Sequence, residues 1–227
     1  MATIAAYLEI GSKRTFAGAI EWPGWCRGGR TEDEAVATLV AYGPRYAKIA
    51  GKGASAFGTP KDVSSIEIVE RVAGSAATDF GAPNAPPSRD SLPLNGAELD
   101  RLVSLLRASW AAFDAAAQAA TGHELRKGPR GGGRDMKKMI EHVLGGEQAY
   151  LRELGGAYKG EPGASVQAEL AAVREAAIQK LRARADGEEP TWSPRRKRPF
   201  WSPRFFVRYT SWHALDHAWE IEDRVIP

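Results

Sequence analysis

Apolar residues recur at steps of three and four after position 95, and this spacing limits the folds that the chain can adopt. The first run consists of Leu99, Leu102, Val103, Leu106, Trp110 and Phe113. Because an α-helix has 3.6 residues per turn, these side chains fall on one face of a helix. Asn95 and Glu98 are placed to cap the start of this helix, and Gly122 follows its end.

The same signals predict three further helices, at about residues 136–154, 165–185 and 202–224. Gly155-Gly156 ends the first of these. Ser202-Pro203 begins the last, with serine as the cap and proline in the first turn. Four helices of this length suit an antiparallel all-α four-helix bundle, and the long connection before the last helix would permit a crossover.

Residues 1–72 show a different pattern. Apolar and polar residues alternate along residues 4–10, and residues 15–22 are a second strand candidate. A turn at Ser12-Lys13 would join the two strands as a hairpin. Residues 65–72 indicate one more strand.

Between these strands the sequence predicts one helix. Thr31 and Glu34 have the spacing of a capping box, and Gly43-Pro44 should break or kink the helix that they begin. The predicted order is β-β-α-β, an α+β domain with an antiparallel sheet and one helix.

Residues 73–95 are rich in Gly, Ala, Ser and Pro and show no periodicity. This composition is typical of a linker that its prolines partly stiffen. We therefore expect two domains, at residues 1–72 and 96–227, joined by the linker.

The composition excludes several classes of protein. The chain has 227 residues, of which 43% are hydrophobic and 26% charged, and a net charge of +3 makes nucleic-acid binding an unfavoured function for the whole chain. One cysteine, Cys26, permits no intrachain disulfide and no cysteine-rich zinc site. No run approaches the ~20 apolar residues of a membrane helix, and no secretory signal is visible, so we expect a cytoplasmic protein that contacts no membrane.

Two of the four histidines, His213 and His217, are four residues apart on the predicted last helix. They can point to one metal ion, or one can be half-buried and the other solvated. His142 lies on the second helix, one turn before Gly145-Gly146. Those glycines would leave space beside His142, either for a ligand or for a closely packed helix.

With these histidines in place, residues 96–227 resemble the DinB-like superfamily of four-helix-bundle metalloenzymes. The resemblance rests on HVLGGEQAYL from His142 and HALDH from His213 to His217. It implies that His142, His213 and His217 bind a divalent metal, zinc or nickel first, with one open coordination position. It also implies a small-molecule substrate and thiol-dependent transfer or isomerisation. The residues GGGRDM before the second helix depart from the W-[ST]-x motif of the family.

Carboxylates near the histidines can orient the imidazole rings through the second ring nitrogen. By helical position the candidates are Asp216, Glu147 and Glu220, each of which can equally be a solvated surface residue. The remaining histidine, His123, falls in a predicted loop.

Basic and aromatic residues alternate along SPRRKRPFWSPRFFVR, at residues 193–208. This stretch can bind nucleic acid, line the pocket of an anionic substrate, or form a solvated loop. Arg204 and Arg208 are the candidates for contact with an anionic substrate.

The N-terminal stretch EWPGWCRGGRTEDEAVATL resembles the HicB-like family. Pro23-Gly24, Gly29 and Thr31 occupy the expected places, as do Glu34 and Ala35. The resemblance implies a partial ribonuclease-H-like β-β-β-α-β fold, found in antitoxins. Trp25, inserted before Cys26, departs from the family pattern, and a helical bundle replaces the usual DNA-binding domain.

Two functions follow from this sequence. One is a metal-dependent enzyme, a transferase or hydrolase, acting on a small molecule. The other is a non-catalytic binding protein in which the HicB-like domain recruits a partner and the bundle is a dimerisation scaffold. A homodimer is compatible with both.

Overall fold

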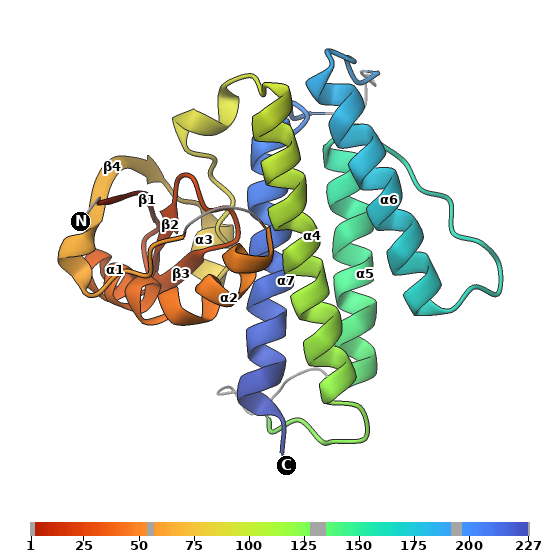
Figure 1. The fold of residues 1–227 in the computed structure, drawn as a ribbon, viewed down its shortest axis with the longest axis horizontal. Helices are drawn as coiled ribbons and strands as arrows, with labels where there is room; N and C mark the ends of the chain where they lie inside the picture. Colours follow the sequence, from red (N-terminus) through yellow and green to blue (C-terminus); the bar gives the residue numbers. More distant parts are fainter. Residues whose placement is uncertain (1–2, 54–56, 128–134, 192–196, 227) are drawn as a thin grey trace.

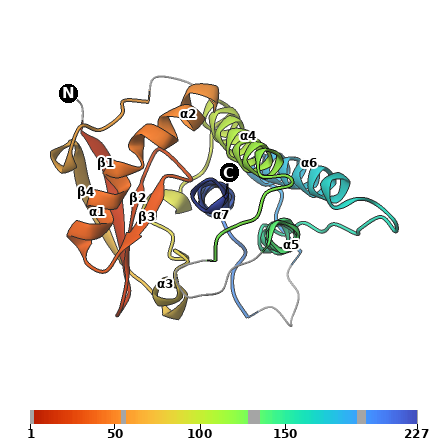
Figure 2. The ribbon, with the colours of Figure 1, turned by 90° about the horizontal axis from the view of Figure 1, so that it is seen from below.

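The computed structural model describes residues 3–53, 57–127, 135–191 and 197–226. A small sheet with short helices lies beside four long helices (Figure 1). The last helix, α7 (Pro203–Arg224), lies between the two parts, with the sheet on one side and the other long helices on the other (Figure 2).

The sheet has four strands in the order β3-β2-β1-β4. Their bounds are β1 Ile4–Ile10, β2 Thr15–Ala19, β3 Cys26–Gly29 and β4 Ile66–Ala73. β1 pairs antiparallel with β2, and β2 with β3, as predicted for the hairpin. β4 pairs parallel with β1, so the expectation of a purely antiparallel sheet was wrong. The reason is that the two helices between β3 and β4 form a crossover, which returns the chain in the direction of β1.

Those two helices are α1 (Glu32–Ala41) and α2 (Gly43–Gly53). Thr31 caps α1 by accepting a hydrogen bond from the amide of Glu34, but the Glu34 carboxylate binds the amide of Arg30 and leaves the capping box half formed. Gly43-Pro44 ends α1 as predicted and also begins α2, because proline suits the first turn of a helix.

The short strand β3 and the helix α2 were not predicted. Residues of β3 include Gly28 and Gly29, so no alternation of apolar side chains marks the strand. The observed order, with three strands before the first helix, agrees with the order that the HicB-like resemblance implies.

Residues 73–95 contain a short helix, α3 (Ala76–Phe80), and a 3-10 turn, η2 (Ser88–Ser91). They are held to the sheet by carboxylates. Glu9 on β1 accepts hydrogen bonds from the amides of Asn84 and Ala85, at 3.1 and 3.0 Å. Glu70 on β4 accepts one from the amide of Ser88. The segment expected as a linker is therefore packed against the sheet in this structure.

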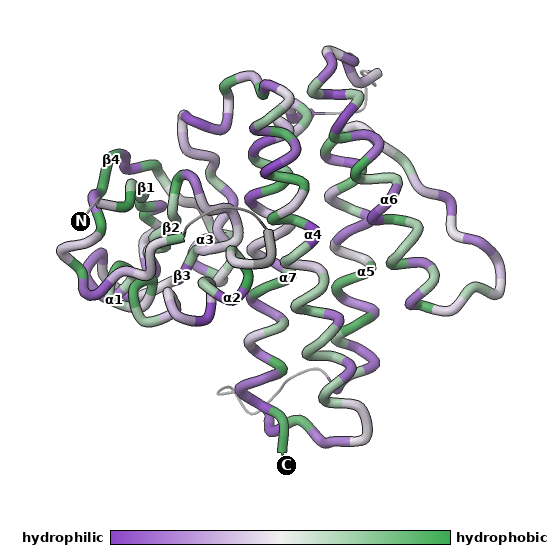
Figure 3. Tube along the Cα trace, in the orientation of Figure 1, coloured by the Kyte–Doolittle hydropathy of each residue, from purple (hydrophilic) through white to green (hydrophobic). Residues whose placement is uncertain are grey.

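The predicted helices of the bundle are all present, as α4 (Gly96–Ala119), α5 (Met136–Glu153), α6 (Val166–Ala185) and α7. The capping box of Asn95 and Glu98 forms in full, and Ser202 caps α7. Hydrophobic and hydrophilic residues alternate along all four helices (Figure 3). Within the described ranges, no helix combines the length and the apolar run that crossing a bilayer requires.

The four long helices do not alternate in direction, as they would in a simple antiparallel bundle. α4 and α7 run in one direction, and α5 and α6 run in the other (Figure 1). Glu147 on α5 contacts Arg174 on α6, and Gly156, just beyond α5, lies against Lys180. Later residues of α5 thus meet later residues of α6, so the two helices run parallel. The connection between α5 and α6 therefore returns the chain along the bundle.

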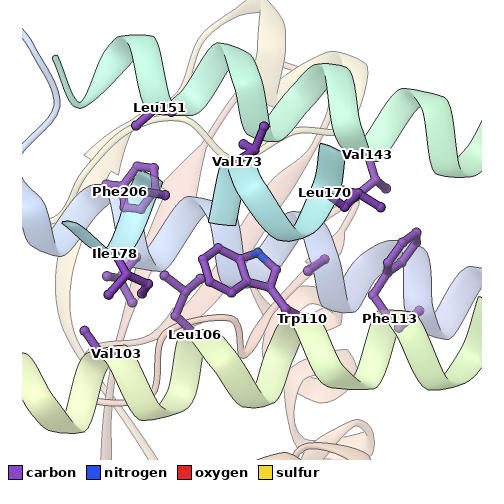
Figure 4. Close-up of a cluster of buried hydrophobic side chains, with 14 of the residues drawn as sticks. Val103, Leu106, Trp110, Phe113, Val143, Leu151, Leu170, Val173, Ile178 and Phe206 are labelled. Atoms are coloured by element: carbon purple, nitrogen blue, oxygen red, sulfur yellow. The ribbon is translucent and has the colours of Figure 1, made fainter. Parts of the chain in front are cut away.

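Apolar side chains from all four helices fill the space between them, with Trp110 and Leu106 in the middle and Phe206 toward one end (Figure 4). A second cluster joins the sheet, α1 and α2 to Ala108, Leu215 and Trp219 of the long helices. Helix α7 contributes to both clusters, and most of its residues are buried.

Candidate metal centre

Three histidines converge between α5 and α7. His142 lies on α5, and His213 and His217 lie on α7, and one ring nitrogen from each is within 4.8 Å of the other two. Nε2 of His142 and Nε2 of His213 are 3.2 Å apart. His213 and His217 are only 5% and 7% exposed, while His142 is half-buried. The three residues that the sequence singled out therefore form one cluster.

A glycine allows α5 and α7 to approach closely at this point. A Cβ atom on Gly146 would lie 3.0 Å from Cε1 of His213 and 3.1 Å from the hydroxyl of Tyr150. A Cβ atom on Gly145 would meet nothing within 4 Å. Of the two glycines, Gly146 makes the space that the sequence predicted, and a histidine ring from α7 fills that space.

The spacing of two of the imidazole nitrogens fits a metal ion. Zn–N bonds of about 2.0–2.1 Å in tetrahedral geometry place two ligand nitrogens roughly 3.3 Å apart. The 3.2 Å between His142 and His213 agrees with this value. Imidazole nitrogens are ligands for zinc, nickel and other divalent transition ions, so the three histidines could hold a metal ion, and one pair of their nitrogens is already at the spacing of metal ligands.

Glu220 orients one of the rings. Oε2 of Glu220 lies 3.0 Å from Nδ1 of His217, and its other oxygen pairs with Arg224. The hydrogen bond from His217 lowers the pKa of Glu220, and Arg224 adds to this effect. A carboxylate that accepts from Nδ1 leaves Nε2 of the same ring as the metal-binding nitrogen.

The other two predicted carboxylates pair with arginines. Asp216 forms an ion pair with Arg27 of β3 at 2.8 Å. Glu147 is buried on α5, and its two oxygens accept hydrogen bonds from Arg174 at 2.9 and 3.1 Å. These contacts connect elements of the fold, so the expectation that both carboxylates orient histidines finds no support in them.

Arg204 and Arg208, the candidates for substrate contact, face the N-terminal half of the chain. Arg208 is 6% exposed, and it binds the Asp90 carboxylate and the carbonyls of Ala19 and Ile20. Arg204 donates to the carbonyls of Leu92 and Pro93 and pairs with Glu98. Protein acceptors contact both guanidinium groups, so these contacts pack α7 against the N-terminal half and give the predicted contact with a substrate no support.

Other residues singled out by the sequence lie apart from the histidine cluster. His123 is exposed, and its Nδ1 contacts the carbonyl of Ile226 at 3.0 Å. Cys26 is buried, and burial raises the pKa of its thiol well above the usual range. Lys197 and Arg198 are exposed, whereas Arg195, Arg196 and the residues 131–134 fall outside the described residues.

Two tyrosines beside the cluster were not assigned a role from the sequence. The ring of Tyr150 packs edge-on against His213 at 5.3 Å between centroids. Tyr150 shares a hydrogen bond with Tyr209, and burial raises the pKa of Tyr150, so its hydroxyl stays protonated. Their spacing offered a signal, because Tyr209 precedes His213 by four residues and Tyr150 follows Gly146 by four.

The comparisons with known proteins agree with this picture for the helical part. A model of the DinB superfamily matches residues 105–221, just over half of the chain, and this span includes all three histidines. No curated protein and no solved structure gave a significant match. The family match does not extend to residues 1–72, where the HicB-like resemblance stays a prediction. The four helices, the motif histidines and this match together show that the chain belongs to the DinB superfamily.

Proposed function

We propose that this protein is a metal-dependent enzyme that acts on a small molecule. His142, His213 and His217 would hold one divalent transition ion, zinc or nickel first, and leave a coordination position open for a ligand. The observation that carries the proposal is the convergence of three imidazoles from two helices, two of them buried and one half-buried, with one of the buried rings oriented by Glu220.

A bound ion of this kind supplies Lewis acidity, which lowers the pKa of a coordinated water or thiol. The reaction classes that fit are thiol-dependent transfer and hydrolysis. The residues of the chain have separate tasks. Glu220 fixes the tautomer of His217, and Gly146 admits the ring of His213. Tyr150 packs edge-on against the ring of His213 and shares a hydrogen bond with Tyr209, so it supports that ring from the side of α5.

The test is the metal content of protein purified without an affinity tag and without added metal. Elemental mass spectrometry should find about one zinc or nickel per chain, and the variant His213→Ala/His217→Ala should lose it. His123→Ala is the matched control, because this histidine lies in a loop away from the cluster. Metal-free protein that also fails to take up zinc, nickel or manganese on titration would overturn the proposal.

A further inference from the structure

A second feature of the molecule lies beside the histidine cluster. A cavity of about 660 Å³ is bordered by α5, by the first turns of α7, by residues 198–202 just before α7, and by residues within 84–91. Its volume falls within the roughly 300–1,000 Å³ of typical small-molecule sites. Its lining includes Tyr150 of α5, Phe205 and Tyr209 of α7, and Trp201 just before α7, together with Pro86 and Pro87 of the segment that precedes the bundle.

The aromatic rings in this cavity form one continuous group. Trp201 stacks on Tyr150 with 5.5 Å between centroids and 25° between planes. It also meets Phe205 and Tyr209 at 4.9 Å each, in edge-on and tilted arrangements. Such a group offers both ring faces and ring edges, and a further aromatic ring can add to it in the same stacked or edge-on geometry.

The proline wall of the cavity is held in place by the N-terminal sheet. The amides on either side of Pro86 and Pro87 bind carboxylates: Asn84 and Ala85 donate to Glu9, and Ser88 donates to Glu70. The cavity is therefore formed before any ligand enters, which lowers the entropy cost of binding.

The cavity and the histidine cluster share two helix faces. On α7, Phe205, Tyr209 and His213 follow one another at intervals of four residues. On α5, Tyr150 lies two turns beyond His142, with Gly146 between them. Since one turn advances about 5–6 Å along the axis, a molecule in the cavity lies about one to two turns from the histidines. Tyr150 contacts both places, because it lines the cavity and packs against His213.

We propose that this cavity binds a planar aromatic ring, and that this ring is part of the substrate on which the metal centre acts. The second clause rests on the proposed function. The ring packs among Trp201, Tyr209 and Phe205, and the reactive end of the molecule extends past Tyr150 toward the histidines. The cavity thus sets the class of substrate, while the metal centre carries out the chemistry.

The first test uses the full-length protein and two probes of similar size, 2-naphthol and its saturated counterpart 2-decalol. Isothermal titration calorimetry should show that 2-naphthol binds at least tenfold more tightly than 2-decalol. Trp201→Leu and Tyr209→Leu should each weaken the binding of 2-naphthol at least fivefold. Phe57→Leu is the matched control, because Phe57 belongs to a separate aromatic cluster with Trp22, Trp25 and Tyr46 and should leave binding unchanged.

If a leucine variant does not fold, Ala149→Trp tests the same point, since it fills the cavity from α5 and should abolish the binding of 2-naphthol. Equal binding of the two probes, or naphthol binding that withstands the blocking variant, would overturn the ring site.

The second test joins the cavity to the metal. In protein loaded with cobalt(II), the protons of bound 2-naphthol should relax faster in NMR spectra than in protein loaded with zinc. Ring binding without this relaxation would place the ring away from the metal and would overturn the substrate clause. A protein that binds no metal would overturn the proposed function and with it the substrate clause, while calorimetry on the metal-free protein still decides the ring site.

Discussion

At the scale of single residues, the site depends on how one carboxylate holds one imidazole. Glu220 accepts from Nδ1 of His217, which leaves Nε2 of that ring as the nitrogen that can bind a metal. A partner of this kind selects the tautomer and increases the basicity of a metal-binding imidazole. The same carboxylate also pairs with Arg224 and is thereby fixed near the end of α7.

Glu220→Gln should therefore weaken zinc binding by about 10–100-fold, the usual effect of removing such a partner. Competition with a chelator of known affinity measures the change. Glu222→Gln is the matched control, because Glu222 lies on the same helix but pairs with Arg45. Equal zinc affinity in wild type and Glu220→Gln would show that this hydrogen bond has no role in the site.

Cys26 illustrates how burial makes a thiol inert. Its pKa is raised mainly by burial, with a further contribution from the charge of Glu9. Because the thiolate is the reactive species, iodoacetamide at pH 8 should alkylate the folded protein at least about 100-fold more slowly than the chain unfolded in guanidinium. Mass spectrometry over time measures both rates. Similar rates in the two states would contradict the buried position.

At the scale of elements, the two neighbouring glycines of α5 allow the effect of a substitution on helix stability to be measured separately from its effect on the histidine cluster. Gly145→Ala meets no neighbour, and it should stabilise the protein by roughly 0.5–1 kcal/mol because alanine favours the helix. Gly146→Ala has the same helical preference, but its Cβ presses on His213 and Tyr150. It should therefore gain less stability and bind zinc more weakly. Urea unfolding and zinc titration compare the two variants, and identical behaviour would show that the close approach at Gly146 is unimportant.

Helix α7 is attached to the N-terminal half through Arg208. Arg208→Leu leaves the Asp90 carboxylate buried without its counter-charge, which should cost about 3–5 kcal/mol in the free energy of unfolding. Arg182→Leu removes an exposed arginine paired with exposed Asp100 and should cost less than about 1 kcal/mol. Adding Asp90→Leu to Arg208→Leu should recover part of the loss. A variant that keeps its stability but loses activity would return Arg208 to the role of a substrate contact.

At the scale of the whole molecule, α7 belongs to both halves. Leu215 and Trp219 pack with the N-terminal sheet and its helices, while Ala214 and Ala218 pack in the bundle core. Ion pairs of Arg27 with Asp216, and of Arg45 with Asp223, add to this junction. The helix that carries two of the three histidines is thus supported from both sides.

The full chain should accordingly unfold in one cooperative transition. Differential scanning calorimetry should give a ratio of calorimetric to van't Hoff enthalpy near 1, as expected for a two-state protein. Two separated transitions, with the first leaving the bundle intact, would mean that the halves fold independently and that residues 73–95 act as the linker expected from their composition.

Local signals in the sequence were sufficient to predict the four long helices and their ends. The period of the apolar residues gives each helix face, and the capping residues Asn95 and Ser202 act within a few residues of their own position. The spacing of His213 and His217 places both rings on one face in the same way. His142 was singled out by its place one turn before Gly145-Gly146, and the resemblance to DinB-like proteins then made it the expected third ligand.

The tertiary structure decided what depends on residues far apart in the sequence. The parallel pairing of β4, the shared directions of α5 and α6, and the packing of residues 73–95 all follow from contacts that no local pattern encodes. The same holds for side-chain roles. The charge of Arg208 predicted contact with an anionic substrate, but its partner is Asp90, which is 118 residues away in the sequence. Glu220 reaches His217 because both residues lie on one helix. Short-range geometry is fixed by the helix itself, and long-range partners are chosen only when the whole chain packs.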